Sequence, residues 1–110
     1  MAGSFDLKKT ASGQFMFNLK AGNGQVILTS EQYKAKASAE NGIKSVRMNS
    51  ADDNRFDVRE SSSGKPYFVL TATNGQVIGQ SEMYSSASAC SNGVASVKKN
   101  APDAKVNDLT

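Results

Sequence analysis

The chain carries one sequence pattern twice, and this repeat constrains the fold more than any other feature. Residues 5–55 align with residues 56–106 without a gap. The positions identical in both copies include Phe5 and Phe56, Asp6 and Asp57, Phe17 and Phe68, Leu19 and Leu70, the runs 23–27 and 74–78, Ser30-Glu31 and Ser81-Glu82, Tyr33 and Tyr84, and Asn41-Gly42 and Asn92-Gly93. We therefore predict one domain over residues 1–110, made of repeat 1 (5–55) and repeat 2 (56–106). Shared positions are expected to be structural, and differing positions to be free for function.

Each repeat opens with three predicted strands. Residues 5–9 and 15–20 alternate apolar and polar side chains, which is typical of half-buried strands. Residues 25–29 form the third strand. The dipeptide Asn23-Gly24 precedes it and favours a type I′ hairpin turn, in which both central residues have positive φ. The first half of each repeat is therefore predicted to be a three-stranded meander.

A helix is predicted to follow the meander over residues 36–49, with a counterpart in repeat 2. Its apolar residues lie at helical spacing and would pack on the sheet: Ala39, Ile43 and Val46. Ser30 is expected to cap a short helical turn that reaches Tyr33. Gly42 lies inside the helix, where glycine costs about 1 kcal/mol relative to alanine. We therefore expect the helix to approach another backbone closely at this point.

The predicted fold class is α+β. One meander with one helix is too small to fold securely, so we expect the two β3-α-β repeats to share a single antiparallel sheet with both helices on one face. Residues 55–60 follow the first helix and also open the second meander. Residues 105–108 occupy the same post-helix position and are predicted to form a final edge strand. The two halves would be related by a pseudo-two-fold axis, and the chain would be a monomer.

The centre of each repeat carries a specific motif. It reads Leu19-Lys20-Ala21-x-Asn23-Gly24-x-x-Ile27-x-x-Ser30-Glu31-x-Tyr33, then Asn41-Gly42-Ile43-x-Ser45-Val46, and it recurs in repeat 2 from Leu70 to Val97. This motif resembles that of the YegP-like family of small bacterial proteins, which carry the domain singly or in tandem. The resemblance implies that single forms pair as homodimers, and that tandem forms are similar to such a dimer fused into one chain, with the last strands exchanged between halves. The family is of unknown function, so the resemblance implies no catalytic or ligand residues.

Few residues in the chain can support catalysis. There is no histidine, which removes the commonest general base and metal ligand, and there is one cysteine. No phosphate-binding glycine motif is present. Cys90 takes the place of Ala39 on the helix stripe, where we expect a buried thiol that behaves as a hydrophobe and not a redox sensor. We therefore expect that the protein is not an enzyme and that it binds no metal and no cofactor.

Two pairs of polar residues are kept in both repeats. Glu31 and Glu82 could perform acid–base chemistry if they lay close together, but an acidic residue in the first turn of a helix is explained by the helix dipole. Tyr33 and Tyr84 are interpreted as half-buried packing residues that each hold a hydroxyl in a hydrogen bond. Both pairs are therefore assigned structural roles.

The net charge of +3 comes from the first half of the chain. This excess could attract a polyanion, although the basic residues do not form a dense cluster. No apolar run approaches the roughly 18 residues that a membrane span needs. The first residues show no signal peptide, so we expect a cytoplasmic protein.

The sheet face opposite the helices is the predicted interaction surface. Its candidate residues are Lys8, Met16, Asn18, Lys20, Arg59, Tyr67 and Val69. An apolar patch of Met16, Tyr67 and Val69 would suit a protein partner. The aromatic and cationic side chains together would alternatively suit weak, sequence-tolerant nucleic-acid binding, and a plain solvated face is the third interpretation. The predicted function is a small cytosolic binding module for a protein partner, with nucleic-acid binding as the alternative.

Overall fold

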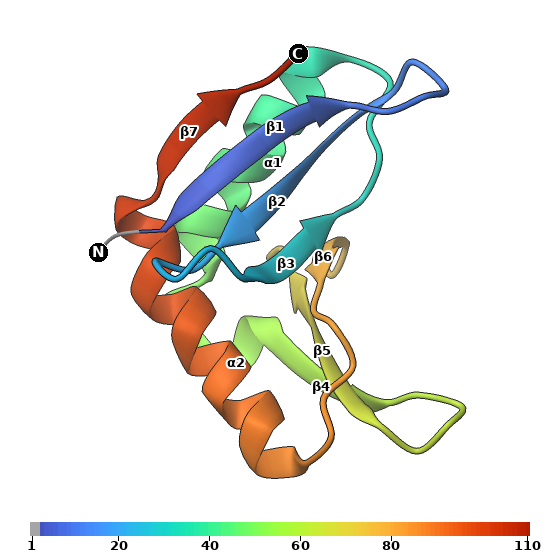
Figure 1. Cartoon of the computed structure of the whole chain (residues 1–110), viewed down its shortest axis with the longest axis vertical. Helices are drawn as coiled ribbons and strands as arrows, with labels where there is room; N and C mark the ends of the chain where they lie inside the picture. The colour runs from blue at the N-terminus through green and yellow to red at the C-terminus, as the bar shows by residue number, and fades with distance from the viewer. Residues whose placement is uncertain (1–2) are drawn as a thin grey trace.

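Seven strands form one sheet in the computed structural model, which describes residues 3–110; residues 1–2 of the predicted domain lie outside this part (Figure 1). The elements in chain order are β1 (Ser4–Lys9), β2 (Phe15–Lys20), β3 (Val26–Ser30), α1 (Lys36–Asn49), the 3₁₀ helix η1 (Asp53–Arg55), β4 (Phe56–Glu60), β5 (Pro66–Thr71), β6 (Val77–Gln80), α2 (Ala87–Asn100), the 3₁₀ helix η2 (Ala101–Asp103) and β7 (Lys105–Asp108). The predicted α+β fold with two β3-α-β repeats is confirmed.

The two repeats meet in the middle of the sheet. The strand order is β4-β5-β6-β3-β2-β1-β7, and β3 pairs antiparallel with β6 through Thr29 and Gln80, which occupy the same position in the two repeats. The final strand of repeat 2, β7, crosses to repeat 1 and pairs with β1, as Figure 1 shows. This last pairing is parallel, so the sheet is mixed and not antiparallel throughout. The chain runs along α2 before it reaches the edge of the sheet beside β1. β7 therefore enters the sheet in the same direction as β1, which makes the pair parallel.

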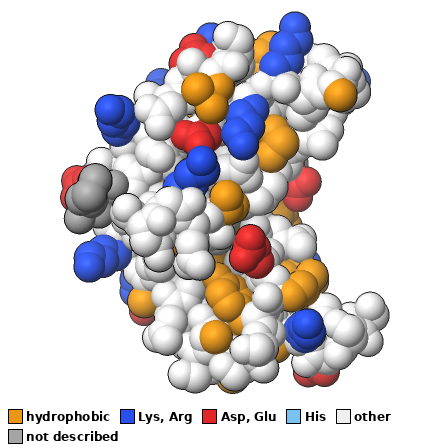
Figure 2. Space-filling view, viewed as in Figure 1, with side chains coloured by type: hydrophobic (Ala, Val, Ile, Leu, Met, Phe, Trp, Pro, Cys, Tyr) orange, Lys and Arg blue, Asp and Glu red, His pale blue; other side chains and the backbone are white. Residues whose placement is uncertain are grey.

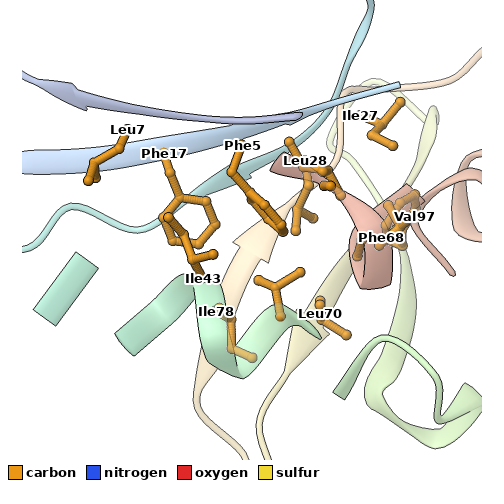
Figure 3. Packing of buried hydrophobic residues seen from close by; sticks show 14 of the residues in the cluster. Phe5, Leu7, Phe17, Ile27, Leu28, Ile43, Phe68, Leu70, Ile78 and Val97 are labelled. Atoms are coloured by element: carbon orange, nitrogen blue, oxygen red, sulfur yellow. The ribbon is translucent and has the colours of Figure 1, made fainter. Parts of the chain in front are cut away.

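The core lies between the sheet and the two helices. Both helices turn a buried stripe toward the same sheet face, with Ala39, Ile43 and Val46 on α1 and Cys90 and Val97 on α2. The sheet supplies large side chains from both repeats (Figure 3), namely Phe5, Leu7, Phe17, Leu19, Leu28, Phe68, Leu70 and Ile78. The two repeats therefore share one continuous core, because neither could bury these aromatic rings alone.

The β2–β3 hairpin differs from the predicted type I′ turn. Gly24 has φ of 85°, but no residue other than glycine has positive φ in residues 3–110, so Asn23 does not adopt the I′ conformation. Ala21 N–H donates to the Gln25 carbonyl at 2.9 Å, which closes a three-residue loop with glycine in the left-handed position. The Asn23 side chain instead accepts a hydrogen bond from Gln25 N–H at 3.0 Å. This side-chain bond fixes the loop without a strained asparagine.

The predicted helical turn at Ser30 is wrong. Ser30 ends β3, and its Oγ accepts a hydrogen bond from Phe17 N–H at 2.8 Å and donates one to the Glu31 carbonyl at 2.7 Å. The main chain of Tyr33 pairs with Phe15 in an isolated β-bridge. α1 begins at Lys36 and has no acidic residue in its first turn, so the helix dipole does not explain Glu31. Ser81 repeats the same bonds in repeat 2.

The close approach predicted at Gly42 exists, but its neighbour is a side chain and not a backbone. A Cβ atom at Gly42 would lie 2.7 Å from the Tyr33 hydroxyl oxygen, and one at Gly93 would lie still closer, 2.2 Å, to the hydroxyl oxygen of Tyr84. Glycine is therefore required at the centre of each helix because a tyrosine ring packs across it.

Candidate functional site

All the predicted interaction residues lie on the sheet face opposite the helices. The pairing of the strands aligns one residue from each strand into a row across this face: Asp57, Val69, Gln80, Thr29, Asn18, Asp6 and Asn107. Asn18 and Val69 are buried within this row. The Asn18 amide donates to Thr29 Oγ1 at 3.0 Å. Asn18 is therefore tied to β3, and both Asn18 and Val69 offer little surface to a partner.

The remaining candidates fall into separate groups. Met16 pairs with Lys8 between β2 and β1, and Tyr67 pairs with Arg59 between β5 and β4. Two strands, β3 and β6, separate β2 from β5, which corresponds to roughly 14 Å at a strand spacing of about 4.8 Å. Because β2 and β5 run in opposite directions, Met16 and Tyr67 also lie on opposite sides of the polar row. The predicted apolar residues therefore do not form one patch.

Asp6 is the best-connected ionisable group on this face. Its side chain is 7% exposed and accepts hydrogen bonds from Lys20 Nζ at 2.7 Å and from the Asn107 amide at 3.0 Å. These two donors, Lys20 first, hold the pKa of the Asp6 carboxyl below its usual range, although burial acts in the opposite direction. Asp6 therefore joins three neighbouring strands, β2, β1 and β7, through its ionised form.

We expect Asp6→Asn to lower the stability most at neutral pH. The folded pKa of Asp6 lies below its unfolded value of about 3.9, so the ionised carboxylate stabilises the fold above that pH and loses this effect as the pH falls through the folded pKa. Urea unfolding between about pH 2 and pH 7 would measure the difference between the variant and the wild type. Asp57→Asn, at the exposed counterpart, is the control. A difference that stays constant down to pH 2 would contradict the assignment.

The cations of the face are largely neutralised by acids of the same face. Lys20 is paired with Asp6, and Arg59 Nε donates to Asp57 Oδ2 at 3.0 Å. Figure 2 shows the result over β1 and β2, where Lys and Arg side chains gather with acidic atoms between them. Within residues 3–110, Lys8 is the candidate cation with no ion pair. The face therefore presents mixed charge and not a continuous basic surface.

A cleft between the two repeats is a feature that the sequence interpretation missed. Its volume is about 640 Å³, and it is lined by Glu31, Tyr33, Ser38, Asn41, Gly42 and Ser45 of repeat 1 and by Ala72, Asn74, Gln76, Val77 and Ile78 of repeat 2. Every lining residue except Ser38 is identical in the two repeats. The sequence signal for this cleft was the set of exposed polar residues kept in both repeats. We had interpreted the residues shared by the repeats as structural.

This cleft has both polar and apolar walls and no cation among its lining residues. Amides, hydroxyls and the carboxylate of Glu31 provide its polar groups, and Tyr33, Ala72, Val77 and Ile78 provide its apolar surface. Burial, and to a lesser degree the Glu31 charge, raises the pKa of Tyr33, so the phenol is a neutral donor at physiological pH. No hydrogen bond fixes the Tyr33 hydroxyl within residues 3–110, contrary to our expectation. The donor set suits an uncharged ligand that carries hydroxyl or amide groups and disfavours anions.

Reactive groups are scarce in the part of the chain that the structure describes. Cys90 is buried, and burial raises the pKa of its thiol, which disfavours the reactive thiolate. No cluster of three His, Cys, Asp or Glu side chains that could hold a metal occurs within residues 3–110. Nor does any helix in this range have the length and apolar character needed to cross a bilayer.

The fold and its mixed face define a small tandem-repeat α+β protein, and comparison with known proteins places it in a family. The domain of unknown function DUF1508 matches residues 11–57 and again residues 61–108. The chain is 55% identical over 108 residues to UPF0339 protein MS1092 of Mannheimia succiniciproducens, covering 98% of this chain and 96% of that protein. It is 52% identical over 108 residues to UPF0339 protein YegP of Yersinia pestis, with the same coverage. The chain therefore belongs to the UPF0339 (YegP-like) family.

Solved structures support the same assignment. The solution NMR structure of yegP from E. coli, described as a protein of unknown function, superposes with a TM-score of 0.95 at 52% identity and covers 100% of this chain and 95% of that one. UPF0339 protein SO3888 from Shewanella oneidensis gives a TM-score of 0.94 at 49% identity, with coverage of 100% and 93%. The predicted resemblance to the YegP-like family is thus confirmed.

Proposed function

We propose that this chain is a small, cytosolic, non-enzymatic binding module that engages a protein partner through the open face of its sheet. In this proposal the tandem repeat acts as a monomeric pseudo-dimer, and its two halves present different surfaces. The contact residues differ between the repeats, since Tyr67 and Arg59 of repeat 2 stand where repeat 1 has Met16 and Lys8. The partner would therefore engage one half of the face and not both halves equally.

The observation that carries this proposal is the internal pairing of charge. Two of the three candidate cations, Lys20 and Arg59, are bound to acids on the same face, at 2.7 Å and 3.0 Å. A nucleic-acid surface needs cations free to replace the counterions of phosphates. A face of mixed charge with a partly exposed tyrosine is more typical of a protein contact, in which tyrosine is often a dominant residue. Protein binding is therefore favoured over the nucleic-acid alternative.

Comparative capture from a bacterial lysate would test the proposal. Tagged wild type, Tyr67→Ala, Met16→Ala and Lys8→Gln would be compared by quantitative mass spectrometry at low and near-physiological salt. We expect one defined partner to be retained by Lys8→Gln and weakened by about 30-fold in Tyr67→Ala, the loss typical of a central contact residue. The Met16 variant reports whether the other half of the face takes part.

An amide NMR titration with mixed-sequence single-stranded RNA and duplex DNA tests the nucleic-acid alternative. Salt-sensitive shifts at Lys8, Lys20 and Arg59 would replace protein binding with nucleic-acid binding. Capture that is the same for all four proteins would refute a role for the open face.

A further inference from the structure

One edge of the sheet is covered by a strand, and the equivalent edge in the other repeat is bare. β7 lies beside β1 and contacts α1 through Asp108 and Val106. β4, in contrast, ends the strand order and has no outer neighbour within residues 3–110. The asymmetry follows from the tandem arrangement. The segment of repeat 1 that corresponds to β7 is residues 54–57, which η1 and β4 already use. Residues 3–110 therefore supply one covering strand for two equivalent edges.

Burial at matching positions shows what the missing strand leaves uncovered. Leu7 on β1 is 1% exposed, whereas Val58, at the same position on β4, is 59% exposed. Phe5 is fully buried and its counterpart Phe56 is only half-buried. Both pairs lie on the helix side of the sheet. The missing strand therefore leaves an apolar strip along β4 on that side, and the open face is not involved.

The main chain of β4 has the same free groups that bind β7 in repeat 1. The Leu7 carbonyl accepts a hydrogen bond from Leu109 N–H at 2.8 Å, which shows that the peptide groups of Leu7 point away from β2. Val58 holds the same place in the ladder between β4 and β5. Its N–H and carbonyl therefore point outward, toward the bare edge.

We propose that β4 accepts an extended segment of another protein as an eighth strand, parallel to β4 and lying against α2. This inference goes beyond the proposed function, because it adds a second mode, at the edge of the sheet and not on its open face, by which a protein partner would be held. Strand addition draws its affinity from main-chain hydrogen bonds and its selectivity from alternate side chains. β4 contains no proline and no bulge that would prevent pairing.

The contacts of β7 define the chemistry of the incoming segment. Asn107 donates from its amide to Asp6, and Asp57 is the equivalent acid on β4, so a side-chain donor is expected at the matching position. Val106, one residue earlier, packs near α1 beside Glu40, Lys44 and Arg47. The α2 counterparts of these three are shorter in sum: Ser91, Ala95 and Lys98. Two of the three side chains that the incoming segment would meet on α2 are therefore smaller than those that Val106 meets on α1, and the third, Lys98, is paired with Asp53. A larger apolar side chain, such as leucine or phenylalanine, is expected at this position.

One contact of β7 has no counterpart beside β4. Lys36 at the start of α1 pairs with Asp108 at 2.5 Å, but the equivalent position on α2 is Ala87. An acidic residue at that place would therefore gain no cationic partner from α2. The preferred occupant is therefore an uncharged or basic extended peptide in which a large apolar residue precedes an amide side chain.

A blocked synthetic peptide provides a direct test. It has the sequence of residues 104–110, with leucine at the position of Val106 and asparagine at the position of Asp108. Titrated into labelled full-length protein, it is expected to shift the amides of β4 and of the α2 residues that face them, with a Kd of about 0.1–1 mM, the range of weak specific contacts. N-methylation at the position of Leu109, whose N–H would bond β4, is expected to weaken binding at least tenfold. N-methylation at the position of Asp108, whose N–H would point away, is the matched control.

The protein side is tested with Val58→Pro. Proline there removes an N–H that faces solvent and none that pairs β4 with β5, so the fold should persist while strand addition is lost. Val58→Thr keeps the N–H and the branched shape, and is expected to bind normally. The N-methylated peptides answer the question independently of how well the proline variant folds.

Four results would overturn the inference. The first is that no amide shifts appear at millimolar peptide, and the second is that the shifts fall on β1 and α1, which would report exchange with β7. The third is that the β4 signals broaden with protein concentration alone, which would report pairing of two copies. The fourth is that N-methylation of the peptide does not change its binding. Failure of the open-face proposal looks different. In that case Tyr67→Ala keeps its lysate partner while Val58→Pro loses it. Binding at the β4 edge would then be supported, and binding through the open sheet face would not.

Discussion

Replacement of Phe68 by alanine is expected to lower the free energy of unfolding by about 3–5 kcal/mol. Phe68 is fully buried on β5, its ring meets Phe56 edge-on at 5.7 Å between centroids, and it stacks on Tyr84 at 6.3 Å. The truncation removes both aromatic contacts and leaves a cavity between the sheet and α2. Because domains of this size are stable by about 5–15 kcal/mol, this loss is a large fraction of the total. Urea denaturation followed by circular dichroism would measure it.

The control for this prediction is Val58→Ala, which truncates an apolar side chain on the neighbouring strand β4. Val58 is largely exposed, so its truncation is expected to change the stability by no more than about 0.5 kcal/mol. Similar losses in the two variants would contradict the core that we describe. A changed denaturant slope for Phe68→Ala would indicate that the variant no longer unfolds in one step.

Gly93→Ala is expected to destabilise the protein although alanine favours helices. A Cβ atom there would lie 2.2 Å from the hydroxyl oxygen of Tyr84 and 2.6 Å from its Cζ, distances that force the ring out of place. Displacing the ring also breaks its stacking on Phe68. We expect a loss of about 1–3 kcal/mol, the usual cost of overpacking.

A double variant isolates the cause of this loss. With Tyr84→Ala already present, Gly93→Ala is expected to be close to neutral, because the obstructing ring is gone and alanine regains up to about 1 kcal/mol of helix propensity. The four proteins would be compared by thermal unfolding and by denaturant titration. If Gly93→Ala is equally damaging in both backgrounds, the tyrosine is not the reason for the glycine.

Local patterns were sufficient to predict most of the secondary structure. The helix over 36–49 was predicted with its observed bounds. Apolar residues at this spacing share one face of a helix, and packing that face on the sheet buries all of them. The errors arose where a side chain forms long-range contacts. Ser30 looked like a helix cap, but its hydroxyl bonds the main chain of Phe17 on the neighbouring strand. Similarly, Gly42 faces a tyrosine ring that sequence spacing could not locate.

The candidate site was less accessible from the sequence. Alternation of side chains placed the predicted residues on the correct face, but it carried no information about which strands are neighbours. Met16 and Tyr67 therefore looked like one patch, although two strands separate them. The cleft between the repeats is made by residues from both halves, so no local window contains it.

The sequence alone determined that the chain is one α+β unit written twice, because strand alternation, helix spacing and the repeat are all encoded locally. Only the tertiary structure decided the strand order, the parallel docking of β7 and the neutralisation of Lys20 by Asp6. These features depend on contacts between residues far apart in the chain. The same long-range packing leaves β4 without an outer neighbour within residues 3–110, because the residues of repeat 1 that correspond to β7 are already part of η1 and β4.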